Sequence, residues 1–217
     1  ARASWNTAPA PERYYRAYAG SQASGERIEK LAATLEDANR NRRILSSYAG
    51  VNADGRAQIR EYSGDYSEAF EYWRDQVPSA ELVQSQKQTA AALRALADGA
   101  ISAFEKERLE YISRHIEFQV PYSEAWSLAH KLHLILKEAG ELKKAGKPED
   151  ARAIVLKQGV PVWLELAPQV RMAMLHFQRI VATRNDLGTL PSKQNKFVRL
   201  ALYRLRLSIQ EYLGELP

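Results

Sequence analysis

Four histidines are the first residues in this sequence whose types could support metal or acid–base chemistry. They are His115, His130, His133 and His176, and all lie in the second half of the chain. Because His130 and His133 are three residues apart, a helix would place them on one face, where both could reach one metal ion. A zinc site needs a third ligand, and no HExxH pattern or neighbouring carboxylate supplies one. We therefore predict no metal site and interpret the histidines as structural or surface residues.

Carboxylates are abundant, but Glu117, Glu124 and Glu165 are the ones that lie among apolar residues. Paired acid–base catalysis depends on a separation in three dimensions that a sequence does not supply. Each of the three is more typical of an ion pair or a helix cap than of a catalyst. The sequence also lacks a GxSxG elbow, a Walker loop, a GxGxxG turn and any cysteine. We predict no cofactor and no recognisable catalytic machinery.

Trp126 and His130 belong to a second face of the helix that we predict over residues 125–146. With His133 and Lys137 they lie beside or opposite an apolar stripe on that helix. If this face is exposed, Trp126 could stack on a sugar ring or dock another domain. If it is buried, the helix lies at the centre of the fold. Burial is the commoner case for such a pattern.

The N-terminal segment, residues 1–24, is unusually rich in aromatic residues. Trp5, Tyr14, Tyr15 and Tyr18 stand close together in the sequence, beside prolines and arginines. One interpretation is a contact for a ligand or another domain. The other is a segment that packs its own rings onto the rest of the protein.

Apolar residues recur at helical spacing nearly throughout, and no sustained alternation indicates a strand. We predict an all-α fold, a compact irregular bundle of about eight helices in one domain over residues 1–217. The segment at 49–65 has three glycines and no period, so we expect the longest loop there. A helix over residues 66–77 should follow it.

Glycines and prolines indicate where the helices end. We expect a break at Asp98-Gly99 and then an inward stripe before Pro121. A short helix over 149–158 should end at Gly159, and another should start at Pro161. The members of the stripe before Pro121 are Ile101, Phe104, Ile112 and Ile116; those of the stripe after it are Ala125, Leu128, Leu132, Ile135, Ala139 and Leu142.

Charge is distributed unevenly along the chain. Residues 1–110 carry 15 basic and 16 acidic groups, a net −1, whereas residues 111–217 carry 16 and 10, a net +6. No dense basic cluster or aromatic-interleaved basic stripe appears, so we predict a solvated basic surface and no nucleic-acid partner. No apolar stretch is long enough to span a membrane, and we predict no membrane partner. Because the chain begins at Ala1, we expect a mature or trimmed product.

Three stretches resemble helical regions of large secreted bacterial glycoside hydrolases. They are RLEYISRHIEFQVPYSEAW at 108–126, VPVWLELAPQVR at 160–171 and IVATRNDLGTLPSKQNKF at 180–197, with YLGELP at the end of the chain. The resemblance implies a polysaccharide-degrading parent enzyme, agarase-like or galactosidase-like, that acts in an extracellular or periplasmic location. It does not imply that this helical part is catalytic, because glycosidase carboxylates normally lie on barrels or sandwiches.

Under this resemblance the partners are other domains of the same parent enzyme, and polysaccharide as a second partner. Arg184, Asn185 and Asp186, at the end of a predicted helix, are candidates for a contact with a saccharide or a neighbouring domain, and equally for a turn. The alternative function is a free-standing helical protein–protein interaction module. Its support is a turn resembling that of tetratricopeptide units at AGKPEDARAIV, together with the uneven charge.

Overall fold

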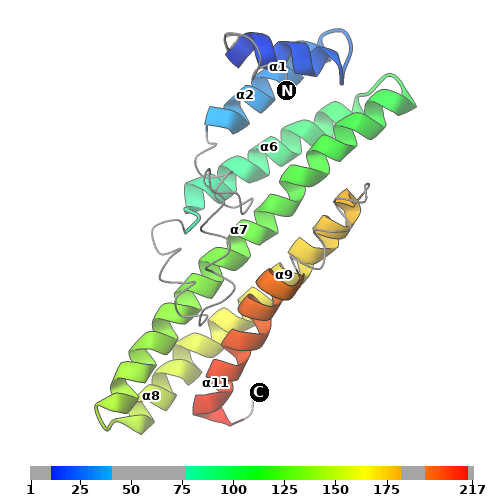
Figure 1. Ribbon diagram of the computed structural model, residues 1–217. Coiled ribbons are helices and arrows are strands. Elements are labelled where there is room, and N and C mark those ends of the chain that lie inside the picture. Colours follow the sequence, from blue (N-terminus) through cyan, green and yellow to red (C-terminus); the bar gives the residue numbers. More distant parts are fainter. Residues whose placement is uncertain (1–10, 41–76, 182–193, 215–217) are drawn as a thin grey trace.

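The computed structural model describes residues 11–40, 77–181 and 194–214. The predicted loop at 49–65, the predicted helix over 66–77 except its last residue, Trp5, and the turn at residues 184–186 lie outside the described residues. Within them the chain is mostly helical and contains no strand (Figure 1). The all-α prediction is therefore confirmed.

The described residues form six continuous helices, so the prediction of about eight was too high. The first four are α1 (Pro11–Gly20), α2 (Arg27–Arg40), α6 (Ala80–Asp98) and α7 (Ala103–Lys144). The fifth joins α8 (Pro148–Ile154), the π-helical segment η3 (Val155–Gly159) and α9 (Val160–Ile180). The sixth joins the π-helical segment η4 (Gln194–Arg204) to α11 (Leu205–Leu213).

The helix breaks predicted at Pro121 and at Gly159 are absent, and both predictions were wrong for the same reason. Pro121 lies inside the 42-residue helix α7, and Gly159 has helical dihedrals (φ −70°, ψ −46°). Proline removes one helical hydrogen bond, and glycine lowers helix propensity by about 1 kcal/mol. Both residues are buried, so packing against neighbouring helices offsets these local costs. By contrast, the predicted break at Asp98-Gly99 is confirmed, because α6 ends at Asp98.

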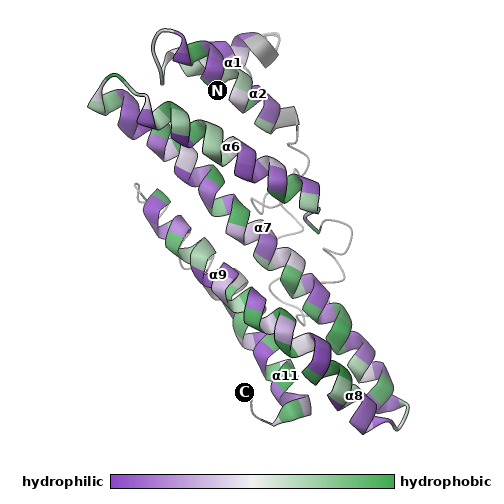
Figure 2. Ribbon diagram, turned by 180° about the vertical axis from the view of Figure 1, so that it is seen from behind, coloured by the Kyte–Doolittle hydropathy of each residue, from purple (hydrophilic) through white to green (hydrophobic). Residues whose placement is uncertain are grey.

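Helix α7 is the long central element of the fold (Figure 1). Helix α6 runs beside its N-terminal half, and the α1–α2 pair lies at that end of the molecule. The other half of α7 packs against α8, α9 and α11. Figure 2 shows apolar and polar residues interspersed along each helix, as expected when one side of a helix faces a core.

Buried apolar residues form two separate clusters along α7. The larger cluster joins α7 to α9 and α11 around residues such as Leu132, Leu166 and Leu205. The smaller cluster lies at the other end and joins α1 and α2 to α6 and α7 around Leu31 and Leu109. The predicted stripe of α7 contributes Ala125, Leu132, Ile135 and Ala139 to the larger cluster, with Leu128 and Leu142 half-buried against it.

The stripe predicted from Ile101 to Ile116 is only partly confirmed. Ile112 and Ile116 are half-buried against the smaller cluster. Ile101 and Phe104, in contrast, are 73% and 64% exposed, so the prediction that they point inward was wrong. The reason is local: Ile101 lies in the loop after α6, and Phe104 lies in the first turn of α7, where the Ser102 cap starts the helix.

Candidate functional site

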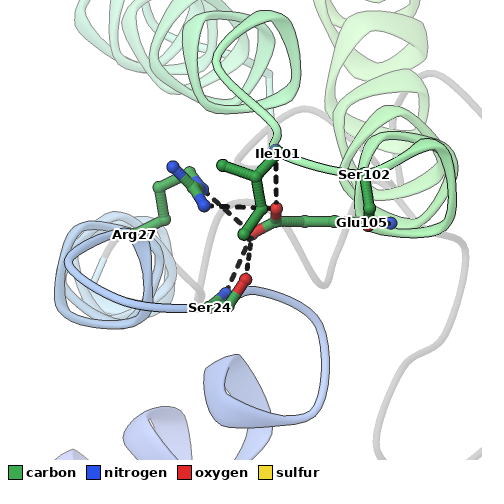
Figure 3. A network of polar contacts seen from close by, with 5 residues as sticks. All are labelled: Ser24, Arg27, Ile101, Ser102 and Glu105. Carbon is green, nitrogen blue, oxygen red and sulfur yellow. Dashed lines mark hydrogen bonds and ion pairs between the residues drawn. The ribbon is translucent and has the colours of Figure 1, made fainter.

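Among the described residues, two carboxylates that each accept several hydrogen bonds join helices, and two exposed surfaces could bind partners. The first junction centres on Glu105, which is 4% exposed (Figure 3). Its carboxylate accepts hydrogen bonds from the backbone N–H and the hydroxyl of Ser24, at 2.9 and 3.2 Å. Arg27 donates from Nε and Nη2 at 2.9 and 3.2 Å, and the backbone N–H of Ile101 donates at 2.9 Å. One carboxylate thus joins the α1–α2 pair to the start of α7.

Local sequence places Glu105 where it can make these contacts. Ser102 caps α7 by accepting a hydrogen bond from the N–H of Glu105 at 3.1 Å, and Glu105 reaches back to the N–H of Ile101. The Arg27 hydrogen bonds are the main reason that the pKa of Glu105 falls from 4.5 to about 2; burial opposes them, and the backbone N–H groups add to them. The carboxylate therefore stays charged throughout the neutral and mildly acidic range.

The second junction centres on Glu117 in the middle of α7. Arg94 of α6 donates to its Oε1 from Nη2 at 2.6 Å and from Nε at 3.1 Å, and the hydroxyl of Ser113 donates at 2.9 Å. His176 of α9 places Nδ1 4.0 Å from the other carboxylate oxygen. Burial is the main cause that lowers the pKa of His176, against the opposing effect of Glu117. The hydrogen bonds of the junction therefore join α6 to α7, and His176 brings α9 beside them.

The Glu117 junction holds a serine, a carboxylate and a histidine, but not in the order that nucleophilic catalysis needs. In a catalytic triad the imidazole stands between the hydroxyl and the carboxylate. Here Ser113 donates directly to Glu117, and Ser113 is fully buried. The arrangement fits a tie between helices, which is the ion-pair role that the sequence favoured for Glu117. Glu124 has the same role, with Lys87 at 2.7 Å, whereas Glu165 is exposed.

The helix face that was predicted to carry Trp126 and His130 belongs to the central helix α7. Trp126 is half-buried against the larger cluster and makes an edge-to-face contact with Tyr122, at 6.2 Å between ring centroids. His133 is buried, His130 is half-buried, and their rings are 6.5 Å apart. Among the described residues no group of three or more His, Asp or Glu is arranged to hold a metal ion. None of the helices in those same ranges has the length and hydropathy to cross a membrane.

An exposed aromatic surface lies at the end of the molecule where α1 meets α7, and we call it the end surface. Its exposed members are Tyr14 and Tyr18 from α1 and Phe104 and Tyr111 from α7; Arg108 and His115 of α7 are half-buried beside them. The guanidinium of Arg108 lies 4.2 Å from the Phe104 ring centroid and donates to the carbonyl of Ser21. Tyr111 packs edge-to-face on His115 at 4.7 Å. The surface therefore spans two segments that are far apart in the sequence.

Burial is the main cause that raises the pKa of Tyr18, and the phenols of Tyr14 and Tyr111 raise it further, while Arg108 lowers it. Of the three tyrosines singled out in the N-terminal segment, Tyr14 and Tyr18 lie exposed on this surface, and Tyr15 is half-buried against the smaller cluster. Of the α7 members, Phe104 was predicted to face the core and His115 was interpreted as a structural or surface residue, whereas Arg108 and Tyr111 were not singled out. The spacing of the α7 members from Phe104 to Tyr111 and His115 follows one helix face and could have indicated them.

The other exposed surface is an apolar stripe on the outer side of α9, which we call the outer stripe. It consists of Leu164, Pro168, Met172 and Leu175, all of them exposed. The residues that face the core from the same helix are Val162, Leu166, Val170, Ala173, Phe177 and Ile180. At 100° per residue the outer stripe stands opposite the core-facing residues. Helix α9 is thus apolar on two sides, and the described residues cover only one of them.

Comparison of the chain with protein-family models, with curated proteins and with solved structures found no match in any of the three. The resemblance to helical regions of glycoside hydrolases therefore remains a prediction.

Proposed function

We propose that the chain is a non-catalytic helical domain of an extracellular polysaccharide-degrading glycoside hydrolase. In this proposal it docks on another domain of its parent enzyme through the outer stripe of α9 and also contacts carbohydrate. The observation that carries the docking role is that α9 is apolar on both sides, while the part of the chain that the structure describes forms a core against only one of them. A helix of this kind ordinarily packs against a second body.

The non-catalytic part of the proposal rests on the carboxylates. Glu105, Glu117 and Glu124 are paired with Arg27, Arg94 and Lys87. A glycosidase needs two carboxylates that face a substrate across an open space of a few ångströms. Carboxylates already held by cations between helices are poorly suited to donate or accept a substrate proton.

The first test is the complete open reading frame of the gene. The proposal expects a catalytic domain in the same polypeptide. An open reading frame that encodes only these 217 residues and a leader would contradict the appended-domain hypothesis, and would favour a free-standing interaction module. That second candidate is supported by the same outer stripe, since an apolar helix face requires a protein partner but not a particular one.

The second test changes the outer stripe in the full-length enzyme. Leu164→Glu with Leu175→Glu should release the helical domain, so that limited proteolysis cuts it from the remainder at least tenfold faster. The matched control is Leu134→Glu, because Leu134 of α7 is 49% exposed and Leu175 is 50% exposed. Equal cleavage of the double variant and the control would count against docking through α9.

A further inference from the structure

The end surface differs in chemistry from the outer stripe, and this difference indicates a different kind of partner. The outer stripe is aliphatic, whereas the end surface presents phenylalanine, tyrosine and histidine rings together with the guanidinium group of Arg108. Aromatic residues of this kind combine an apolar body with a polar tip. A sugar ring has the complementary form, with an apolar C–H face surrounded by hydroxyl groups.

Contacts around the end surface hold it in place before any ligand arrives. Arg108 is fixed between the Phe104 ring and the carbonyl of Ser21. The Glu105 junction fixes the α1–α2 loop and the start of α2 against the start of α7, and Arg108 bonds to Ser21 just after α1, so α1 lies near the start of α7. Side chains that are already ordered lose less entropy on binding. The end surface is therefore a preorganised surface and not a set of independent rings.

The length of the end surface sets the size of its ligand. Phe104 and Tyr111 are seven residues apart on α7, which corresponds to about 10.5 Å along the helix axis at 1.5 Å per residue. This is longer than one pyranose ring. A ligand that reaches both rings must contain at least two linked sugars.

We propose that the end surface binds a polysaccharide chain, with aromatic rings stacking on sugar faces and with polar tips hydrogen-bonded to hydroxyl groups. This inference deepens the carbohydrate contact in the proposed function and rests on it for the choice of ligand class. It does not depend on the outer stripe. A result against docking through α9 would therefore not contradict carbohydrate binding by the end surface. A result against carbohydrate binding would likewise not contradict the docking role.

Affinity electrophoresis of the 217-residue chain tests the proposal. The probes are native gels that contain agarose oligosaccharides, galactan, xylan or a soluble β-glucan, with a polysaccharide-free gel as reference. At least one probe should retard the chain, and free galactose or glucose should compete poorly. Tyr111→Ala should weaken retardation by about tenfold, equivalent to about 1.4 kcal/mol. The matched control is Tyr203→Ala, since Tyr203 is 61% exposed but lies on η4.

A second variant separates the end surface from the individual rings. Glu105→Gln leaves the six side chains of the end surface unchanged but loosens α1 and α2 from α7. It should therefore also weaken the retardation of the chain in the polysaccharide gels. The thermal unfolding of the Tyr111 and Tyr203 variants should match that of the wild type. Unchanged mobility of the wild-type chain in every probe gel would overturn the proposal, as would equal retardation of the Tyr111 and Tyr203 variants. Loss of binding to the rest of the parent enzyme in Tyr111→Ala, without retardation by any polysaccharide, would reassign the surface to a protein partner.

Discussion

The end surface and the outer stripe are built in different ways, and the difference decides how each can be lost. The outer stripe lies within one helix, so it exists wherever α9 is helical. The end surface combines residues from α1 and α7, about ninety positions apart, and depends on the contact between them. That contact comprises the smaller apolar cluster and the Glu105 junction.

The comparison shows that a surface drawn from distant segments depends on residues that do not belong to it. Ser24, Arg27 and Glu105 are not members of the end surface, yet they determine whether its two halves meet. The outer stripe has no equivalent requirement. Its helix is held by the larger cluster, and His176 places α9 beside the Glu117 junction. Perturbing the two junctions should therefore affect the two surfaces separately.

The largest effect is expected from removing the carboxylate at position 105. Glu105→Ala leaves the donors of Arg27, Ser24 and Ile101 without their acceptor. Loss of one partner from a buried, hydrogen-bonded ion pair typically costs about 3 kcal/mol. We expect this loss in the unfolding of the α1–α2 region, measured by urea denaturation with tyrosine fluorescence. Arg16→Ala is the control, since Arg16 pairs with Glu29 at an exposed site and should cost under about 1 kcal/mol.

A smaller effect is expected from the Glu117 junction. Glu117→Gln retains an acceptor for Ser113 but weakens the charged hydrogen bonds from Arg94, and such bonds contribute about 1.5 kcal/mol or more each. Because this junction reaches α9, the variant should lower the stability of the region that carries the outer stripe. Circular dichroism during thermal unfolding measures the change. If Glu117→Gln lowered the hydrogen-exchange protection of α1 and α2 but not that of α9, the assignment of the Glu117 junction to the α9 region would be contradicted.

The smallest effect is a dependence on pH that should distinguish the two junctions. Since the pKa of His176 is lowered by burial, the unfolded chain takes up its proton at a higher pH than the folded chain. Stability from this residue is complete above pH 6.5 and is lost as pH falls through that value. The Glu105 contribution is complete above pH 4.5 and is lost as pH falls towards about 2. His176→Asn should reduce the loss of stability that occurs as pH falls below 6.5, measured by urea denaturation; an unchanged slope would contradict this assignment.

Sequence patterns predicted the parts of this molecule that depend on local spacing. The all-α class, the break at Asp98-Gly99 and the buried stripe after Pro121 all follow from such patterns. The predictions that helices end at Pro121 and Gly159 were wrong because tertiary packing offset the low helix propensity of these two residues. The ion pairs of Glu117 and Glu124 matched the structural role predicted from their apolar surroundings.

Non-local contacts could not be predicted in the same way. Nothing in the sequence links Glu105 to Ser24 and Arg27, which lie 81 and 78 residues away. Tyr14 was selected as a contact residue, but its α7 neighbours were not, because Phe104 was assigned to the core. A surface made by two distant helices becomes visible only when their packing is known.

Hydrogen exchange of the Glu105→Gln variant, followed by mass spectrometry, tests most directly whether the Glu105 junction builds the end surface independently of α9. Peptides from α1 and α2 should lose protection relative to the wild type, while peptides from α9 should exchange at the wild-type rate. Unchanged protection in α1 and α2, or an equal loss of protection in α9, would contradict the account.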